Sequence, residues 1–183
     1  MVDPDYGTHH SFDINIHDTY SHGAAVGRNA IVRDFMKSDC DALWMIDADT
    51  VPPRNLSFVD AMEEMEYPVL CGPYKGFNEQ YGGSFWHVYK KVTDRGYLPM
   101  PRKKWPADRF FKVDVAGTGC MLIRRNVIEE GRPDPFYLKI DSAGHVITED
   151  MSFCKDVGGV WLDSHYVCKH ERDVNLDYVK ERP

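Results

Sequence analysis

The sequence of 183 residues contains no long hydrophobic run, and this absence excludes an integral membrane protein of the helical type. No stretch approaches the roughly 18 consecutive apolar residues that a membrane-spanning helix requires. The first ten residues are polar and acidic, unlike a secretory signal peptide. The sequence therefore predicts a protein without a membrane span, which we expect in the cytoplasm.

The sequence lacks any pairing pattern among its cysteines. The five cysteines are an odd number, scattered without a Cys-x-x-Cys pair, which favours reduced thiols over a disulfide framework. Cys154, His165, Cys168 and His170 fall within a short segment, but their spacing matches no standard structural zinc pattern. Isolated buried thiols are the favoured interpretation, with a structural zinc as the alternative.

Positive charge is also in short supply, since 22 Lys and Arg stand against 29 Asp and Glu, for a net charge of −7. Phosphate neutralisation supplies much of the affinity for nucleic acids, so this balance argues against a general nucleic-acid binder. The basic run 102–104, with Lys112 beyond it, is expected to be a solvated loop. A small anionic acceptor at this run is the alternative.

The remaining composition is that of a folded domain. Hydrophobic residues make up 43% and charged residues 28%, which excludes disorder, and the length suits one domain. We predict a single domain over 1–183. It includes a loop-like amino end at 1–11, an irregular loop or hairpin insertion at 74–111 and a surface tail at 174–183.

Hydrophobic periodicity predicts alternating strands and helices in the first half and a mixture of short elements in the second. The first half reads as a strand at 12–16, a helix at 24–37, a buried strand at 42–46, a helix at 55–66 and a strand at 69–71. The second half reads as strands at 84–91, 97–100, 112–115 and 120–124, a helix at 150–157, and strands at 159–163 and 166–170. The β-α-β-α-β order of the first half indicates an α/β fold with a parallel sheet.

Acidic residues follow one of these predicted strands. Asp47 and Asp49 come directly after the apolar run 42–46, and Arg28 lies in the first turns of the preceding helix. In a parallel sheet these groups meet at one edge, where two carboxylates and a guanidinium are costly to hold without a charged ligand. A divalent cation suits the carboxylates and a phosphate suits the arginine. An acidic turn that caps the next helix is the alternative.

Four segments resemble a known family when they are taken in order. They are G-R-N-A-I-V-R-D-F-M from Gly27, L-W-M-I-D-A-D-T from Leu43, I-T-E-D-M-S-F-C from Ile147 and W-L-D from Trp161. Together they resemble family 2 glycosyltransferases of the GT-A fold, especially short versions from phages and bacteria. The resemblance implies a GT-A-like α/β architecture, a mostly parallel sheet flanked by helices. The family's usual first strand is either missing or diverged, and the setting would be the cytoplasm of a bacterium or a phage-infected host.

The resemblance also implies a reaction and roles for individual residues. The reaction is metal-dependent, inverting transfer of a sugar, of the hexosyl type, from a nucleotide-sugar donor to a hydroxyl acceptor, with Mn²⁺ or Mg²⁺. Asp47 would lie near the sugar and the ribose, and Asp47, Asp49 and His170 would bind the metal. Arg28 would lie near the nucleotide, and Asp150, beside Glu149, would be the catalytic base. The turn of Gly117, Thr118 and Gly119 would lie on the acceptor side.

These roles are chemically coherent. A metal ion stabilises a leaving diphosphate, a positioned carboxylate takes the proton of the acceptor, and an imidazole ligand favours Mn²⁺ over Mg²⁺. For Glu149 and Asp150 the alternative is an ordinary acidic first turn of a helix. Trp86, in an aromatic-rich region, is a candidate platform for a sugar ring, with a place in a satellite core as the alternative.

Two other functions remain open. A nucleotidyltransferase uses metal-binding carboxylates as well, but the glycine- and arginine-rich phosphate loop typical of that class does not occur after the first strand. A degenerate, non-catalytic module that binds a glycan or a partner is favoured by the short amino end. The sequence names neither the sugar, the nucleobase nor the acceptor.

Overall fold

The computed structural model describes residues 23–78, 83–93, 96–142 and 144–171. The predicted strand at 12–16, the loop-like amino end and the tail at 174–183 lie outside the described residues. Within the described part of the chain, no helix is both long enough and apolar enough to cross a membrane.

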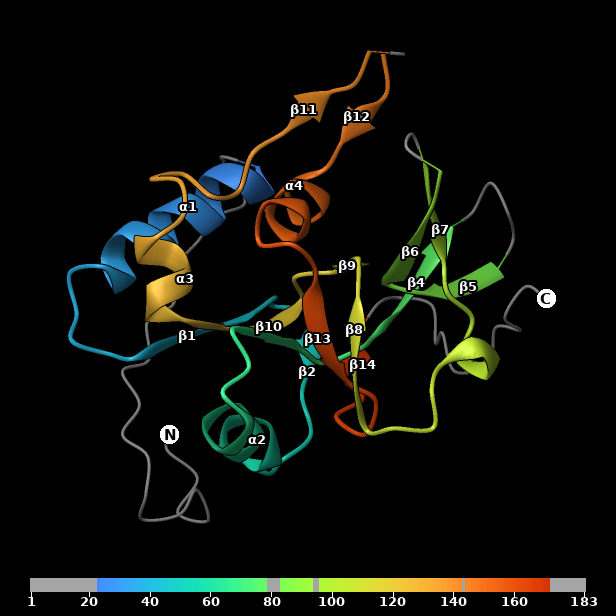
Figure 1. Cartoon of the computed structure of the whole chain (residues 1–183), viewed down its shortest axis with the longest axis horizontal. Helices are drawn as coiled ribbons and strands as arrows, with labels where there is room; N and C mark the ends of the chain where they lie inside the picture. Colours follow the sequence, from blue (N-terminus) through green and yellow to red (C-terminus); the bar gives the residue numbers. More distant parts are fainter. Residues whose placement is uncertain (1–22, 79–82, 94–95, 143, 172–183) are drawn as a thin grey trace.

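A five-stranded sheet forms the centre of the structure (Figure 1). Its strands, in spatial order, are β1 (Ala42–Ile46), β10 (Cys120–Arg124), β3 (Val69–Cys71), β13 (Val160–Asp163) and β8 (Phe110–Val113). Strand β10 runs antiparallel to both of its neighbours, β1 and β3. Strand β13 pairs parallel with β3 and antiparallel with β8.

The predicted GT-A-like architecture, a mostly parallel sheet flanked by helices, is therefore wrong. Only the β3–β13 pairing of the central sheet is parallel, and the other sheets of the described residues are small and antiparallel. The error has a physical reason. Both faces of β10 are covered, so its residues form a continuous apolar run, and such a run carries no information about strand direction or partner.

The small sheets surround the central one. They pair β2 (Thr50–Val51) with β14 (Lys169–His170), β4 (Lys75–Asn78) with β5 (Gly83–Trp86), β11 (Lys139–Ile140) with β12 (Val146–Ile147), and β6 (Val88–Thr93) with both β7 (Gly96–Pro99) and β9 (Val115–Ala116). In Figure 1, β11 and β12 project from the body as a hairpin. The single strand predicted at 84–91 is divided into β5 and β6, which belong to different sheets, and the strand predicted at 97–100 is confirmed as β7. A short 3-10 helix, η2 (Arg102–Lys104), spans the basic run.

Helices lie on both sides of the central sheet. The helices are α1 (Ala24–Phe35), α2 (Ser57–Met65), α3 (Arg125–Glu129) and α4 (Glu149–Asp156). Figure 1 shows α2 on one side of the sheet and α1, α3 and α4 on the other. The predicted helices at 24–37, 55–66 and 150–157 are confirmed as α1, α2 and α4. The five-residue α3 was not predicted, because it is too short to show helical periodicity.

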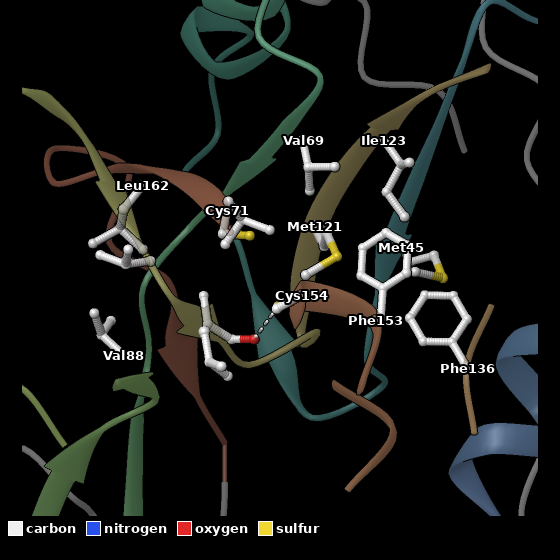
Figure 2. Packing of buried hydrophobic residues seen from close by; sticks show 14 of the residues in the cluster. Met45, Val69, Cys71, Val88, Met121, Ile123, Phe136, Phe153, Cys154 and Leu162 are labelled. Atoms are coloured by element: carbon white, nitrogen blue, oxygen red, sulfur yellow. Dashed lines mark hydrogen bonds between the residues drawn. The ribbon is translucent and has the colours of Figure 1, made fainter. Parts of the chain in front are cut away.

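Alternate residues of β10 pack against opposite faces, which creates two hydrophobic clusters. Met121 and Ile123 belong to the larger cluster, which also contains Phe153 of α4. Cys120 and Leu122 belong to the cluster on the α2 side. In the larger cluster, the rings of Phe136 and Phe153 stack with their centroids 4.7 Å apart (Figure 2). The central sheet is therefore packed on both faces, and this packing holds the ends of its strands in place.

Leu162 provides a test of this core. Its side chain is fully buried in β13, so Leu162→Ala is expected to lower the free energy of unfolding by roughly 2–5 kcal/mol through lost contacts and a residual cavity. Leu98→Ala, at a residue that is 60% exposed, is the matched control and is expected to change that free energy by less than about 0.5 kcal/mol. Urea unfolding of both variants measures the difference, and equal losses would contradict this core.

Candidate functional site

The directions of the central strands bring several loops to one edge of the sheet. Because β10 is antiparallel to β1 and to β3, these two strands run in the same direction, and β13 runs with them. The carboxyl ends of three strands therefore share an edge with the amino end of β10. Asp47 leaves β1 at this edge, and its backbone N–H donates to the carbonyl oxygen of Gly119 over 3.0 Å. The predicted meeting point of strand ends thus exists although the sheet is not parallel.

Arg28 of α1 joins two carboxylates that are far apart in the sequence. Its Nη2 donates to both oxygens of Asp47, each over 3.0 Å, and its Nη1 donates to Oε1 of Glu149 over 2.7 Å. The Arg28 side chain is only 11% exposed, so these contacts replace most of its water. Two carboxylates against one guanidinium leave this triad with one negative charge in excess. The sequence predicted Arg28 and Asp47 as neighbours but did not predict that Glu149 would contact the arginine.

Asp49 and His170 form a second pair beside the triad. Strand β14 pairs with β2 so that His170 lies opposite Thr50, and Nε2 of His170 lies 3.0 Å from Oδ2 of Asp49. The other ring nitrogen, Nδ1, lies 2.7 Å from the carbonyl oxygen of Lys75. A carbonyl oxygen only accepts hydrogen bonds, so Nδ1 carries a proton. In a neutral imidazole the Nε2 lone pair then faces a carboxylate oxygen, and this arrangement calls for a proton or a cation between them.

The donor atoms of this pair fit a divalent cation. Metal–ligand bonds of about 2.1 Å that meet at about 90° place two ligand atoms about 3.0 Å apart, which matches the observed separation of 3.0 Å. The Lys75 carbonyl supplies the outer hydrogen bond that commonly orients a ligating histidine. Among the described residues, no group of three or more His, Cys, Asp or Glu is arranged to hold a metal. Mg²⁺ is commonly bound through one or two protein carboxylates, with water and substrate phosphates as its other ligands.

Asp47 and Asp150 differ in how their oxygens are used. Both oxygens of Asp47, predicted as a metal ligand, accept hydrogen bonds from Arg28. Asp150 begins α4 with Glu149, and its Oδ1 accepts from the backbone N–H of Met151 over 2.8 Å and from the hydroxyl of Thr148. No hydrogen bond from the described part of the chain reaches Oδ2 of Asp150. This carboxylate is thus held by one oxygen and leaves the other available.

The predicted acceptor turn, Gly117 to Gly119, is buried and packs against Tyr74. A Cβ on Gly117 would lie 2.2 Å from the Tyr74 hydroxyl oxygen, and a Cβ on Gly119 would lie 2.8 Å from the ring. Both glycines are therefore required by the close approach of the tyrosine. Thr118 between them is 2% exposed. The role of this turn toward an acceptor stays a prediction.

Tyr74 is a site residue that the sequence analysis missed. It follows β3 at the same edge, its ring stacks on His87 with the centroids 4.7 Å apart, and its ring meets that of His170 edge-on at 5.1 Å. Burial raises its pKa, the negative charge of Asp47 raises it further, and the hydrogen bond from the Gly119 N–H opposes these effects. The sequence signal was present as an aromatic residue three positions after a predicted strand, at Gly-Pro-Tyr.

The structure does not bring Trp86 to this group of residues as a platform for a sugar. Its side chain is 5% exposed and belongs to the larger hydrophobic cluster. Its ring meets Trp105 edge-on at 5.2 Å, and the guanidinium of Arg102 lies 5.4 Å from its centroid. These contacts leave the ring no open face for stacking on a sugar. The position agrees with the alternative prediction, in which Trp86 belongs to a hydrophobic core.

The cysteines and histidines considered for zinc lie apart. Cys154 belongs to the larger cluster and Cys168 to the cluster on the α2 side, so the sheet separates them, and His165 is exposed. The Cys154 thiol donates to the Ala116 carbonyl oxygen over 3.5 Å (Figure 2). Burial, the main cause, raises the pKa of this thiol to about 12. None of the five cysteines, all of which lie in the described part of the chain, forms a disulfide bond.

Comparisons with known proteins bear on the fold. No family model matches the chain, and no curated protein matches it. Among solved structures, the crystal structure of the viral protein A197 from STIV matches with a TM-score of 0.58 and 22% sequence identity. The match covers 88% of this chain and 78% of that chain. The protein therefore shares its fold with A197 from STIV over most of its length.

Proposed function

We propose that this protein is a metal-dependent glycosyltransferase that moves a sugar from a nucleotide-diphosphate sugar to a hydroxyl acceptor with inversion, in the cytoplasm. One observation carries the proposal: the triad of Arg28, Asp47 and Glu149 and the pair of Asp49 and His170 converge at one edge of the central sheet. The resemblance of four sequence segments to family 2 glycosyltransferases, from which the individual roles are taken, supports the same conclusion.

The charges at this edge favour a cationic ligand. Asp47, Asp49, Glu149 and Asp150 contribute four carboxylates, against which Arg28 supplies one fixed positive charge. Several of these groups are partly buried, and an excess of one sign in such surroundings is costly unless a counter-charge binds. Mn²⁺ or Mg²⁺, accompanied by a diphosphate, meets this requirement because the phosphates complete the coordination that the protein leaves open.

Each residue then has a definable task. Asp49 and His170 would hold the ion, which when bound stabilises the negative charge on the departing diphosphate. Arg28 is fixed in place by Asp47 and Glu149, and its positive charge would attract the phosphates of the donor. Asp47, next to this cation, suits hydroxyl groups of the ribose or the sugar.

Asp150 would act as the general base. As the acceptor hydroxyl oxygen bonds to the anomeric carbon, the bond from that carbon to the diphosphate oxygen breaks, and the proton of the hydroxyl passes to Oδ2 of Asp150. The Oδ1 atom keeps its bonds to Met151 and Thr148, so the carboxylate retains its orientation through this transfer. A single displacement of this kind inverts the configuration at the anomeric carbon.

The proposal predicts metal-dependent binding of a nucleoside diphosphate by the unmodified protein. Calorimetry with UDP, GDP and dTDP is expected to show binding of at least one of them with Mn²⁺ or Mg²⁺ and none in EDTA. The matching nucleotide-sugars are then expected to release the nucleoside diphosphate by slow, metal-dependent hydrolysis, which requires no acceptor. Pyrophosphate release from a nucleoside triphosphate would indicate a nucleotidyltransferase instead. Absence of nucleotide binding under every condition would overturn the proposal in favour of a non-catalytic glycan-binding module.

A further inference from the structure

The hydroxyl of Tyr74 is a buried hydrogen-bond donor without an acceptor in the described part of the chain. Its oxygen accepts from the backbone N–H of Gly119 over 3.3 Å, but its own O–H donates to no described residue. Tyr74 is only 6% exposed, so little water reaches the ring and its hydroxyl. Buried donors in folded proteins nearly always have a partner, and this one lies within the proposed binding site.

The location of the hydroxyl identifies what it faces. It lies against Gly117, whose missing side chain leaves room for it, and Gly119 in the same turn is hydrogen-bonded to the backbone of Asp47. Because Gly119 also donates to the Tyr74 hydroxyl, this hydroxyl lies close to Asp47 and to the Arg28 guanidinium that binds Asp47. A phenol is protonated at neutral pH, so the hydroxyl is able to donate a hydrogen bond.

The neighbours of Tyr74 also indicate the chemical class of its partner. Carboxylates accept hydrogen bonds, and they repel an anionic phosphate oxygen placed beside them. A neutral hydroxyl oxygen is tolerated there, because it can donate to a carboxylate and accept from the phenol at the same time. The diphosphate is better accommodated beside Arg28 and beside the ion that Asp49 and His170 would hold. The oxygen that Tyr74 meets is therefore a neutral hydroxyl oxygen of the donor, and binding of the nucleoside diphosphate alone separates a hydroxyl of the ribose from one of the transferred sugar.

We propose that Tyr74 is a specificity-determining residue whose hydroxyl donates a hydrogen bond to a hydroxyl oxygen of the transferred sugar. This inference rests on the proposed glycosyl transfer and extends it to a defined contact with the sugar. A site that reads a hydroxyl group in this way rejects analogues that lack it, because the buried donor is then left without a partner.

The substitution Tyr74→Phe tests the contact, since phenylalanine retains the stacking on His87 and removes only the hydroxyl. The first probe is the nucleotide-sugar that binds most tightly among UDP-glucose, UDP-galactose, UDP-N-acetylglucosamine, GDP-mannose and dTDP-glucose. The second probe is the nucleoside diphosphate of that nucleotide-sugar, and both are measured with Mn²⁺. Affinity for the nucleotide-sugar is expected to fall roughly tenfold, and affinity for the nucleoside diphosphate is expected to stay within twofold.

Tyr166→Phe is the matched control. Tyr166 is also buried, with 1% of its surface exposed, but its hydroxyl donates to the backbone carbonyl oxygens of Pro53 and Asn55, over 3.0 and 3.2 Å. This variant is expected to lose thermal stability and to keep both affinities. The contrast between the two variants separates a contact with the sugar from a general effect of removing a buried hydroxyl.

A second arm uses only the unmodified protein and so does not depend on how the variant folds. Analogues of the same nucleotide-sugar that lack one sugar hydroxyl at a time are expected to include one that binds roughly tenfold more weakly. The inference is overturned if every analogue binds equally well, if Tyr74→Phe changes neither affinity, or if it weakens both ligands alike. The proposed function fails separately, when the unmodified protein binds no nucleoside diphosphate with any metal.

Discussion

Replacing Asp49 by alanine is expected to abolish metal-dependent nucleotide binding and to leave the protein folded. Asp49 and His170 are the two described side chains whose donor atoms, 3.0 Å apart, suit adjacent positions on one cation. Loss of an outer hydrogen bond around a metal typically costs 10–100-fold in affinity, so loss of a direct ligand is expected to cost more than about 100-fold. Calorimetry with Mn²⁺ and the nucleoside diphosphate that binds the unmodified protein measures the effect.

Two further variants make this result specific. His170→Ala is expected to cause a similar loss, and the double variant is expected to lose little more, because both residues serve one ion. Glu130→Ala removes an exposed carboxylate next to α3, which follows the far end of β10, and is expected to have no effect. Unchanged affinity in Asp49→Ala, with the unfolding temperature also unchanged, would refute the metal site. An equal loss of nucleotide affinity in Glu130→Ala would mean that the net charge of the protein, and not a metal site, determines the affinity.

The edge that carries the site could be predicted from the sequence even though the sheet could not. The helix between β1 and β3 requires these strands to run in the same direction, and the observed pairings give them that direction. The hydrophobic pattern could not predict that β10 lies between β1 and β3, because both strands are more than 45 residues away from β10 in the sequence. The acids after β1 were therefore placed correctly by local reasoning, and the sheet type was not.

Contacts between distant residues account for most of what the sequence left open in the site. Arg28 and Glu149 are separated by 121 positions, as are Asp49 and His170. No periodicity links residues over such a distance, so the resemblance alone suggested His170, and nothing suggested the bond between Arg28 and Glu149. The burial of Trp86 was equally inaccessible, because an aromatic residue in an irregular segment has the same composition whether it lies in a core or at a surface.

The substitution Asp150→Asn is expected to abolish turnover and to preserve donor binding. Asparagine has the shape of aspartate, and its Oδ1 can still accept from the Met151 N–H and the Thr148 hydroxyl, so α4 is expected to begin as before. Its amide nitrogen replaces Oδ2 and cannot take a proton from an attacking hydroxyl or water. Removal of a general base lowers kcat roughly 10²–10⁴-fold. Metal-dependent release of nucleoside diphosphate from a nucleotide-sugar reports kcat, and calorimetry reports donor affinity.

Glu149→Gln is the matched control for this result, because it removes one negative charge from the adjacent residue in the same helical turn. The Oε1 of Glu149 is already engaged by Arg28 over 2.7 Å, so this residue positions the guanidinium and does not accept the proton. We expect Glu149→Gln to change donor affinity and to lower kcat by less than about tenfold, well below the loss expected for a general base. If kcat falls equally in both variants, the total negative charge of this helical turn determines kcat, and Asp150 has no special role as a base. If Asp150→Asn turns over normally, Asp150 is not the base.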